Sequence, residues 1–355
     1  MTALAKAMTG RPAIIAALGA ALLFGASTPF AKLLASHVSP VLLAGLLYLG
    51  SGLGLSAIRL VRDRGFVAPT LLAREWFWFV GAIVSGGVVG PVLLMYGLTQ
   101  TSASDASLLL NLESVFTALL AWVVFREHTD RRIVLGMALI VAGGASLAWP
   151  HGGISGGGLR GESAIACACL CWALDNNLTR KVSAADALFI AGTKGLAAGI
   201  TNCVVAMVLG AAFPASTLLV AAMTIGLFGY GLSLMLFVVA LRGLGSGRTG
   251  AYFSTAPFLG ATIALVFFHE SATQGFWIAA LLMAGGVWLH LTERHEHEHS
   301  HPAMTHSHAH VHDAHHAHQH DGTWNGAEPH THEHIHEPLT HSHPHFPDIH
   351  HQHRH

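Results

Sequence analysis

The sequence predicts an all-α polytopic membrane protein with ten transmembrane helices, arranged as two inverted five-helix repeats and followed by a disordered His-rich tail. Three observations support this fold class: the composition, a duplicated segment and an abrupt change of character after Leu291. Of the 355 residues, 52% are hydrophobic and 10% are charged, whereas about a quarter of the residues are charged in a typical soluble domain. Apolar runs of about 20 residues, each long enough to cross a hydrocarbon core of ~30 Å, recur along the chain.

A long segment of the chain occurs twice. Thr117–Gly144 and Gly260–Gly286 each contain an apolar helix, a short polar break and a second apolar helix that ends in Ala-Gly-Gly. The alignment extends without gaps from Leu98–Glu127 to Leu241–Glu270. A repeat of this length indicates a duplicated module. Residues 12–149 and 162–292 are therefore predicted to be two copies of one domain, and residues 293–355 a separate tail.

Apolar runs and polar breaks predict the transmembrane spans of both copies. The spans lie at residues 12–35, 39–60, 76–98, 102–125, 131–149, 162–180, 186–210, 216–241, 246–268 and 275–292. Each copy holds five spans, and because five is odd, the second copy must cross the membrane in the opposite orientation. Inverted repeats are common in secondary transporters, whose substrate site lies near the midplane between the halves.

Lysine and arginine are concentrated in the loops of one membrane side. The basic residues of that side are Lys6, Arg11, Arg59, Arg62, Arg64, Arg74, Arg126, Arg131, Arg132, Arg180, Lys181, Arg242 and Arg248. The opposite loops hold only Arg160, with Lys32 near the end of a span. This bias predicts cytoplasmic termini and a bacterial-type inner membrane. The first apolar run is longer than the core of a signal peptide, so we expect it to be the first span.

Four further patterns point to one family. They are FGASTPFAK in the first span, the segment Ala103–Leu112, the helix ends Phe125-Arg126-Glu127 and His269-Glu270, and the Ala-Gly-Gly ends of the fifth and tenth spans. With these patterns, residues 12–292 resemble the drug/metabolite transporter superfamily, in its EamA-type group with two five-helix domains. The resemblance implies a central cavity lined by both halves. It also implies a proline near the middle of the fourth and ninth helices, where Pro257 fits and Ser114 departs.

Ionisable and polar residues inside the spans are the candidate substrate-binding or coupling residues. A charged side chain at mid-helix costs about 2.5–3.5 kcal/mol in lipid, so it is expected to have a function. A buried tyrosine hydroxyl likewise needs a partner. The candidates are Glu113, Lys194, Asp175, Asn176, Lys32 and Tyr252.

Each charged candidate has a functional and a structural interpretation. Glu113, in the middle of the fourth span, is predicted to couple transport to protons or to contact a cation; alternatively, it forms a static ion pair, for example with Lys194. Lys194 could instead bind an anionic group of the substrate. Asp175 and Asn176 either line the cavity or satisfy backbone groups. Lys32 either faces the cavity or extends to the lipid headgroups.

Other polar residues are expected to be structural. Glu127 and Glu270 follow helix ends and are predicted to act there as caps, near Thr129 and Ser271. The cysteines at 167–171 form C-x-C-x-C, in which neighbouring thiols point to nearly opposite sides of a helix. They are therefore expected to be small buried residues and not a metal site.

The tail is rich in histidine. Of the 28 histidines, 23 lie between His295 and His355, mostly as His-x-His. The almost complete lack of large apolar residues predicts disorder, and short His-rich tracts are typical of metal binding, here of Ni, Zn, Co or Cu. A solvated tail that titrates with pH and a passive extension remain alternatives. The predicted ligands are His295, His297, His299, His301, His306, His308, His310, His312, His315, His316, His318, His320, His330, His332, His334, His336, His341, His343 and His345.

The sequence therefore predicts a secondary-active transporter, with export as the expected direction, of a small metabolite or drug-like solute, with a metal-binding regulatory tail and no required cofactor. Efflux of Ni, Co or Zn and a membrane-anchored metal sensor are the alternatives. The spans contain almost no histidine, which argues against metal as cargo. Motifs of enzymes such as H-E-x-x-H are absent from the sequence. The expected partners are the solute, the lipid bilayer and divalent metal ions, with no nucleic acid; a monomer and a homodimer both remain open.

Overall fold

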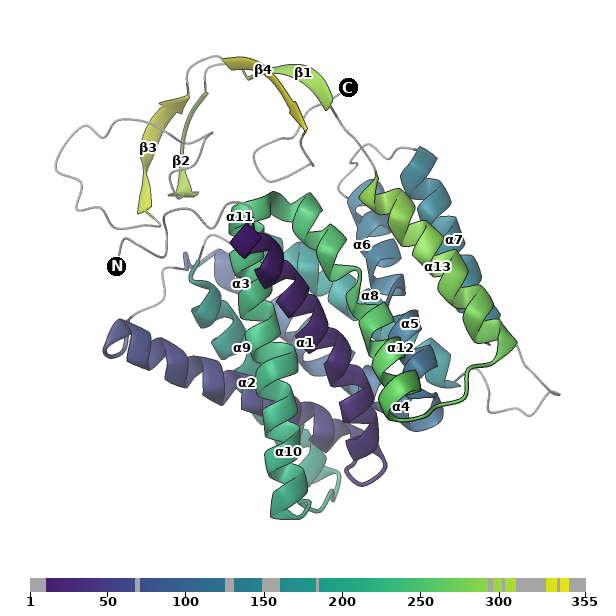
Figure 1. Ribbon diagram of the computed structural model, residues 1–355. Coiled ribbons are helices and arrows are strands. Elements are labelled where there is room, and N and C mark those ends of the chain that lie inside the picture. Colours follow the sequence, from purple (N-terminus) through teal and green to yellow (C-terminus); the bar gives the residue numbers. More distant parts are fainter. Residues whose placement is uncertain are drawn as a thin grey trace.

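The protein is a bundle of helices with strands in its tail (Figure 1). The computed structural model describes residues 11–67, 71–124, 131–148, 160–182, 185–292, 296–301, 304–310, 330–336 and 339–344. The first half comprises α1 (Arg11–Ala35), α2 (Pro40–Asp63), α3 (Glu75–Ala82), the π-helix η1 (Ile83–Val89), α4 (Gly90–Gln100), α5 (Ala103–Leu109), α6 (Leu112–Val123) and α7 (Arg131–Ala148). The second half comprises α8 (Arg160–Arg180), α9 (Ala187–Val208), α10 (Ser216–Gly226), the π-helix η2 (Leu227–Leu232), α11 (Ser233–Phe253), α12 (Ala256–Phe267) and α13 (Gln274–Leu291).

The predicted fold class is confirmed. Within the described residues, eight helices are long and apolar enough to cross a membrane. The sixth span, α8, has a lower hydropathy because it contains Asp175, Asn176 and Asn177. The ninth span is divided between the end of α11 and the short helix α12. With these two, the chain has the ten helical spans of the predicted architecture.

The inversion of the two halves is visible where α2 crosses α9. The two helices run antiparallel, because Gly45 lies against Cys203 at one end of the contact and Ser56 lies against Gly192 at the other. At the spacing of the sequence repeat, Gly45 corresponds to Gly192 and Ser56 to Cys203. Exchanging the halves therefore converts one contact into the other. The pseudo-twofold axis between the repeats passes through this crossing.

Both halves contain a π-helical turn at the same place. η1 and η2 occupy corresponding positions of the third and eighth spans. After each turn an amide donates to the carbonyl five residues earlier, from Gly90 to Ser85 and from Ser233 to Phe228. The sequence predicts continuous α-helices here, and no residue pattern marks the change. Such turns occur often at functional sites because they free backbone groups from the regular ladder.

The fourth and ninth spans are both broken, although each is predicted as one helix. The first break lies between α5 and α6, and the second lies between α11 and α12. Although Ser114 replaces the family's proline, its span breaks all the same. Its hydroxyl donates to the carbonyl of Asn111 at 2.7 Å, and at the second break the Thr255 hydroxyl donates to Tyr252 at 2.6 Å. The backbone amides of Ser114 and Thr255 donate to the same two carbonyls, each at 3.2 Å, so each break is closed by a hydroxyl and an amide.

The prediction of a loop between the eighth and ninth spans is wrong. Residues 242–245 are helical backbone within α11, which ends only at Phe253. Gly243 and Gly245 resemble turn signals, but a glycine costs a helix only about 1 kcal/mol relative to alanine. Continuous helix keeps the backbone groups bonded at the membrane boundary, which favours it over an open loop.

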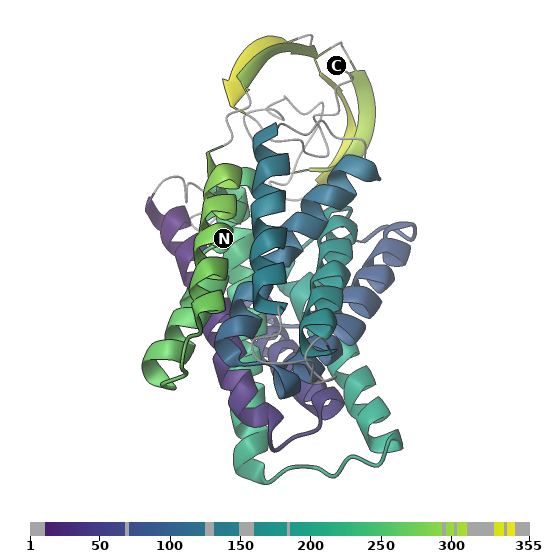
Figure 2. The same cartoon turned by 90° about the vertical axis from the view of Figure 1, so that its right-hand side faces the viewer.

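The tail contains four short strands, β1 (Glu296–His301), β2 (Met304–His310), β3 (His330–His336) and β4 (Leu339–Pro344). They form two antiparallel ribbons, β1 with β4 and β2 with β3, which lie beyond the end of the bundle where α13 ends (Figures 1 and 2). Composition did not predict these strands. An isolated two-stranded ribbon is marginally stable in water. The expectation that the tail builds no hydrophobic core is unchanged.

The α2–α9 crossing generates the first prediction. A methyl group at Gly195 would lie 2.6 Å from the backbone nitrogen of Gly52, so Gly195→Ala should force the two helices apart and lower stability by about 1–3 kcal/mol. The measurement is thermal unfolding of the full-length protein in detergent. Gly285→Ala is the matched control, because its methyl group would meet only Leu139, at an ordinary 3.7 Å. Equal melting temperatures for both variants would contradict the close crossing.

Candidate functional site

Glu113 lies at the break in the fourth span. It is in the first turn of α6, where the positive end of the helix dipole stabilises a carboxylate. The Asn176 side-chain amide of α8 donates to Glu113 Oε1 at 2.7 Å. α8 packs across the break, with the Cys169 thiol 3.7 Å from the carbonyl oxygen of Leu109. The structure thus brings together Glu113 and Asn176, two of the predicted site residues.

Asn176 lies on the inward side of α8. The exposed residues Cys167, Leu170 and Leu174 form one stripe along α8, at helical spacings of three and four. Asn176 lies on the opposite face, one turn from the buried Trp172, and yet it is exposed. Asn176 and the Glu113 carboxylate beside it therefore lie on the face of α8 that is turned away from the outer stripe.

Asp175 and Lys194 form a buried ion pair. Lys194 Nζ contacts Asp175 Oδ2, and the two side chains are only 9% and 7% exposed. The Thr179 hydroxyl donates to the other carboxylate oxygen of Asp175 at 2.9 Å. Lys194 therefore pairs with Asp175. The alternative in which Lys194 pairs with Glu113 is wrong. Asp175 is the neighbour of Asn176 in α8, and Asn176 donates to Glu113, so the three charged side chains form one cluster.

The π-turn η1 forms one wall of this cluster. The hydroxyl of Tyr48 and the indole Nε1 of Trp172 both donate to the carbonyl of Gly86, at 2.7 and 3.0 Å. A methyl group at Gly86 would overlap the carboxylate of Asp175. Only glycine therefore allows η1 and α8 to approach this closely. No sequence pattern singles out Gly86, and the signal for Tyr48 is limited to a hydroxyl inside an apolar span.

Aromatic rings meet where the two halves join. Phe24 and Trp172 are equivalent residues of the two repeats, and their ring centroids lie 6.2 Å apart in an edge-on contact. Tyr230 contacts Phe24 at 6.0 Å and Tyr48 at 5.4 Å. Phe253 covers the other side of Phe24 at 5.3 Å. Contact between equivalent residues places this aromatic cluster close to the pseudo-twofold axis.

The charges, unlike the rings, have no charged counterparts across the axis. At the spacing of the repeat, the residues equivalent to Glu113, Asp175 and Lys194 are uncharged: Ala256, Ser27 and Leu47. The centre is therefore nearly symmetric in shape and asymmetric in charge.

Two predicted site residues lie elsewhere. Lys32 donates to the backbone carbonyls of Leu98 and Thr101, the second at 2.8 Å, so it neither reaches for headgroups nor joins Glu113. Its ammonium satisfies carbonyls left free where α4 ends. Tyr252 packs against Ala16 and Ala240, between α1 and α11. The resemblance alone did not distinguish these positions from the centre.

Glu270 is a cap, but of a different helix from the one expected. Its carboxylate accepts the amides of Ala103 and Ser104 at 3.0 and 2.8 Å, which lie at the start of α5 in the other half. The prediction of a cap near Ser271 is therefore wrong, because the nearest free helix N-terminus comes from the first repeat. Glu127, its counterpart, lies outside the described residues.

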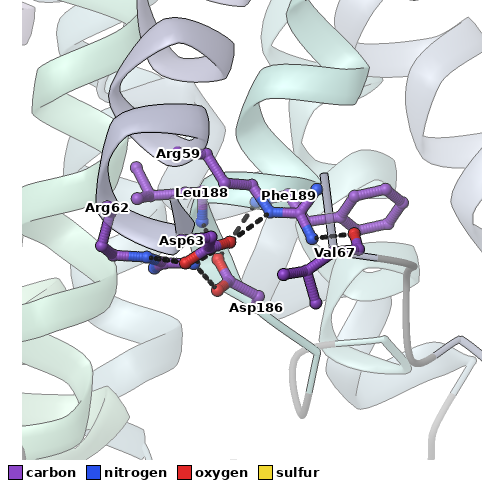
Figure 3. A network of polar contacts seen from close by, with 7 residues as sticks. All are labelled: Arg59, Arg62, Asp63, Val67, Asp186, Leu188 and Phe189. Atoms are coloured by element: carbon purple, nitrogen blue, oxygen red, sulfur yellow. Dashed lines mark hydrogen bonds and ion pairs between the residues drawn. The ribbon is translucent and has the colours of Figure 1, made fainter. Parts of the chain in front are cut away.

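An ionic network joins the halves at the opposite end of the bundle (Figure 3). Arg62, in the last turn of α2, pairs with Asp63 at 2.7 Å and with Asp186, the N-cap of α9. Arg59 lies 3.5 Å from Asp63 and 5.1 Å above the ring of Phe189. The Arg62–Asp186 pair thus connects the first repeat to the second, as Glu270 does at the other end.

No group of three or more potential metal ligands occurs among the side chains that the structure describes. The tail histidines predicted to bind metal fall outside those described side chains. Their role remains a prediction from the sequence.

Comparison with known proteins agrees with this architecture. An uncharacterized transporter of Methanothermobacter thermautotrophicus is 28% identical over 294 residues, which are 78% of this chain and 84% of its own length. The probable 4-amino-4-deoxy-L-arabinose-phosphoundecaprenol flippase subunit ArnE of Pseudomonas fluorescens is 34% identical over 103 residues, which are 29% of this chain and 88% of its own length. One known crystal structure shares the fold, with a TM-score of 0.60 at 20% identity, over 79% of this chain and 98% of its own.

Both repeats match one family separately. Residues 11–148 and residues 159–292 are each similar to the EamA-like transporter family. The chain therefore belongs to the EamA-like transporter family, within the drug/metabolite transporter superfamily, and is a multi-pass membrane transporter.

Proposed function

We propose that this transporter is secondary-active and exports a small metabolite or drug-like solute by alternating access, with Glu113 as the residue that couples export to protons. The observation that carries the proposal is the position of Glu113. Its carboxylate lies at a helix break beside Asn176, on the inward side of α8. Discontinuous helices at the midplane are typical of substrate and ion sites in inverted-repeat transporters.

The contacts between the halves support alternating access. The α2–α9 crossing is close at the backbone, whereas the contacts at the two ends are polar: Arg62 with Asp186, and Glu270 with the start of α5. Polar contacts exchange for water at little net cost. One half can therefore rock against the other about the crossing, opening one end at a time.

The orientation follows from the basic loops. With the positive-inside rule, the end of the bundle that carries the tail faces the cytoplasm. Both termini are then cytoplasmic, in a bacterial-type inner membrane. The proposal holds equally for a monomer and for a homodimer.

The tail is proposed to bind Ni, Zn, Co or Cu and to regulate transport. Its alternating imidazoles are suitable ligands for these ions. The alternative, transport of the metal itself, finds less support at the centre, where the cluster contains two carboxylates and one ammonium but no histidine. A metal sensor without transport activity is the remaining alternative.

Glu113→Gln is the first test of this function. The variant keeps the size of the side chain and its contact with Asn176 but cannot exchange a proton, so we expect a complete loss of solute-driven proton movement. The measurement uses proteoliposomes that contain a pH-sensitive dye, screened with amino acids, drug-like compounds and Ni, Co, Zn and Cu salts. Glu75→Gln, at an exposed helix start, is the control. Wild-type proton movement in Glu113→Gln would refute the coupling role.

We assign a structural role to the Asp175–Lys194 pair, so variants of the pair should lose stability, unlike Glu113→Gln. Removing one partner leaves a buried charge unpaired, so Asp175→Asn or Lys194→Met should each destabilise the protein by about 3–5 kcal/mol. The double variant should recover most of that loss, since no lone charge remains. A double-mutant cycle of thermal stability in detergent measures this. Additive losses in the double variant would show that the two side chains do not depend on each other.

Deletion of residues 293–355 separates regulation from transport. We expect the truncated transporter to keep its flux, to lose its binding of Ni or Zn and to lose any response of flux to these ions. In the full-length protein, metal binding should weaken as the pH falls from about 7.5 to about 5.5, because protonated imidazole cannot bind metal. Calorimetry and proteoliposome flux check these outcomes. Loss of all flux on deletion would favour the sensor.

A further inference from the structure

We propose that the transported solute is a monovalent organic cation with a ring-sized apolar body, bound by the Glu113 carboxylate and by the aromatic side chains beside it. The inference rests on the proposed transport function and names the substrate class of the same site. Three observations carry it: the charge balance of the centre, the position of Lys194 and the aromatic cluster.

The charge balance leaves one negative charge at the centre. Asp175 and Lys194 neutralise each other in a buried pair. Among the described side chains, the hydrogen-bond donor to Glu113 is the neutral amide of Asn176. An ionised Glu113 is therefore not balanced by a dedicated cation of its own. A bound cation would supply the missing charge, whereas an anion would add a second negative charge next to it.

Lys194 does not provide an anion site. Its ammonium is in contact with Asp175, and its side chain is only 9% exposed. An anionic solute would have to displace Asp175 and leave that carboxylate buried without a partner, which is costly. The structure thus disfavours the binding of an anionic group by Lys194, which the sequence left open.

Aromatic rings adjoin the carboxylate. Trp172 lies one helical turn from Asn176 on the same face of α8, and it contacts Phe24 across the axis. Phe24 is only partly buried, although Trp172, Tyr230 and Phe253 all contact its ring. Aromatic faces attract organic cations, with about 0.5–2 kcal/mol for each contact. A carboxylate next to such rings recognises a positive charge on an apolar body.

The test measures binding of three probes of similar size and different charge to the full-length protein in detergent: benzyltrimethylammonium, phenylacetamide and phenylacetate. Calorimetry should show the cation binding at least about tenfold more tightly than the other two, a factor that corresponds to about 1.4 kcal/mol. Glu113→Gln should abolish this preference, and Phe24→Leu should weaken binding of the cation severalfold. Phe24→Tyr, which keeps an aromatic face, should retain it, and Glu75→Gln should change nothing.

Three results would overturn the proposal: equal or tighter binding of phenylacetate, a cation preference that survives in Glu113→Gln, or no measurable binding of benzyltrimethylammonium. Binding is measured without transport, so the two proposals fail separately. An anion preference together with normal proton-coupled flux would refute the cation class alone. Cation binding together with flux that is independent of protons would refute coupling alone.

Discussion

A backbone amide or carbonyl that lies within a membrane must find a partner in the protein, and the centre of this transporter depends on that constraint. A substrate site needs polar groups at the midplane, but a broken helix exposes several of them at once. Here the hydroxyls and the backbone amides of Ser114 and Thr255 both bond to a carbonyl at their break. The carbonyl of Gly86, within a π turn, is instead bonded by Tyr48 and Trp172. The breaks are therefore stable, and they place Glu113 where an unbroken helix would not.

Duplication explains the scaffold, and departures from it explain the site. Equivalent π turns, equivalent breaks and the antiparallel α2–α9 crossing all follow from one module used twice in opposite orientations. The charged residues do not follow this rule. The equivalents of Glu113, Asp175 and Lys194 are Ala256, Ser27 and Leu47, so none of the three charges has a charged counterpart in the other half. The scaffold is therefore close to symmetric, whereas its charged groups are not.

The sequence was sufficient for the fold, because span length, loop charge and repeats act over long stretches of chain. It identified Glu113, Asp175, Asn176 and Lys194 as polar residues in apolar spans. Their pairing could not be read in this way, because it depends on which helix faces which across the bundle. One alternative predicted an ion pair between Lys194 and Glu113, but the partner of Lys194 is Asp175. The carboxylate of Asp175 fits there because η1 has a glycine, Gly86, at the point of contact.

The contacts between the halves also differ in kind, and this difference bears on how the protein moves. At the crossing, backbone meets backbone through Gly52 and Gly195, with no side chains between them that could rearrange. At the ends, an ion pair and a helix cap can each be replaced by water. A close contact resists separation but permits rotation about it, whereas polar contacts are lost and regained at modest cost. In the alternating access that we propose, the crossing is the pivot, and the Arg62–Asp186 pair and the Glu270 cap are the contacts that open in turn. Because Glu113 lies between these two ends, a change in its charge or its ligand can bias which of them is closed.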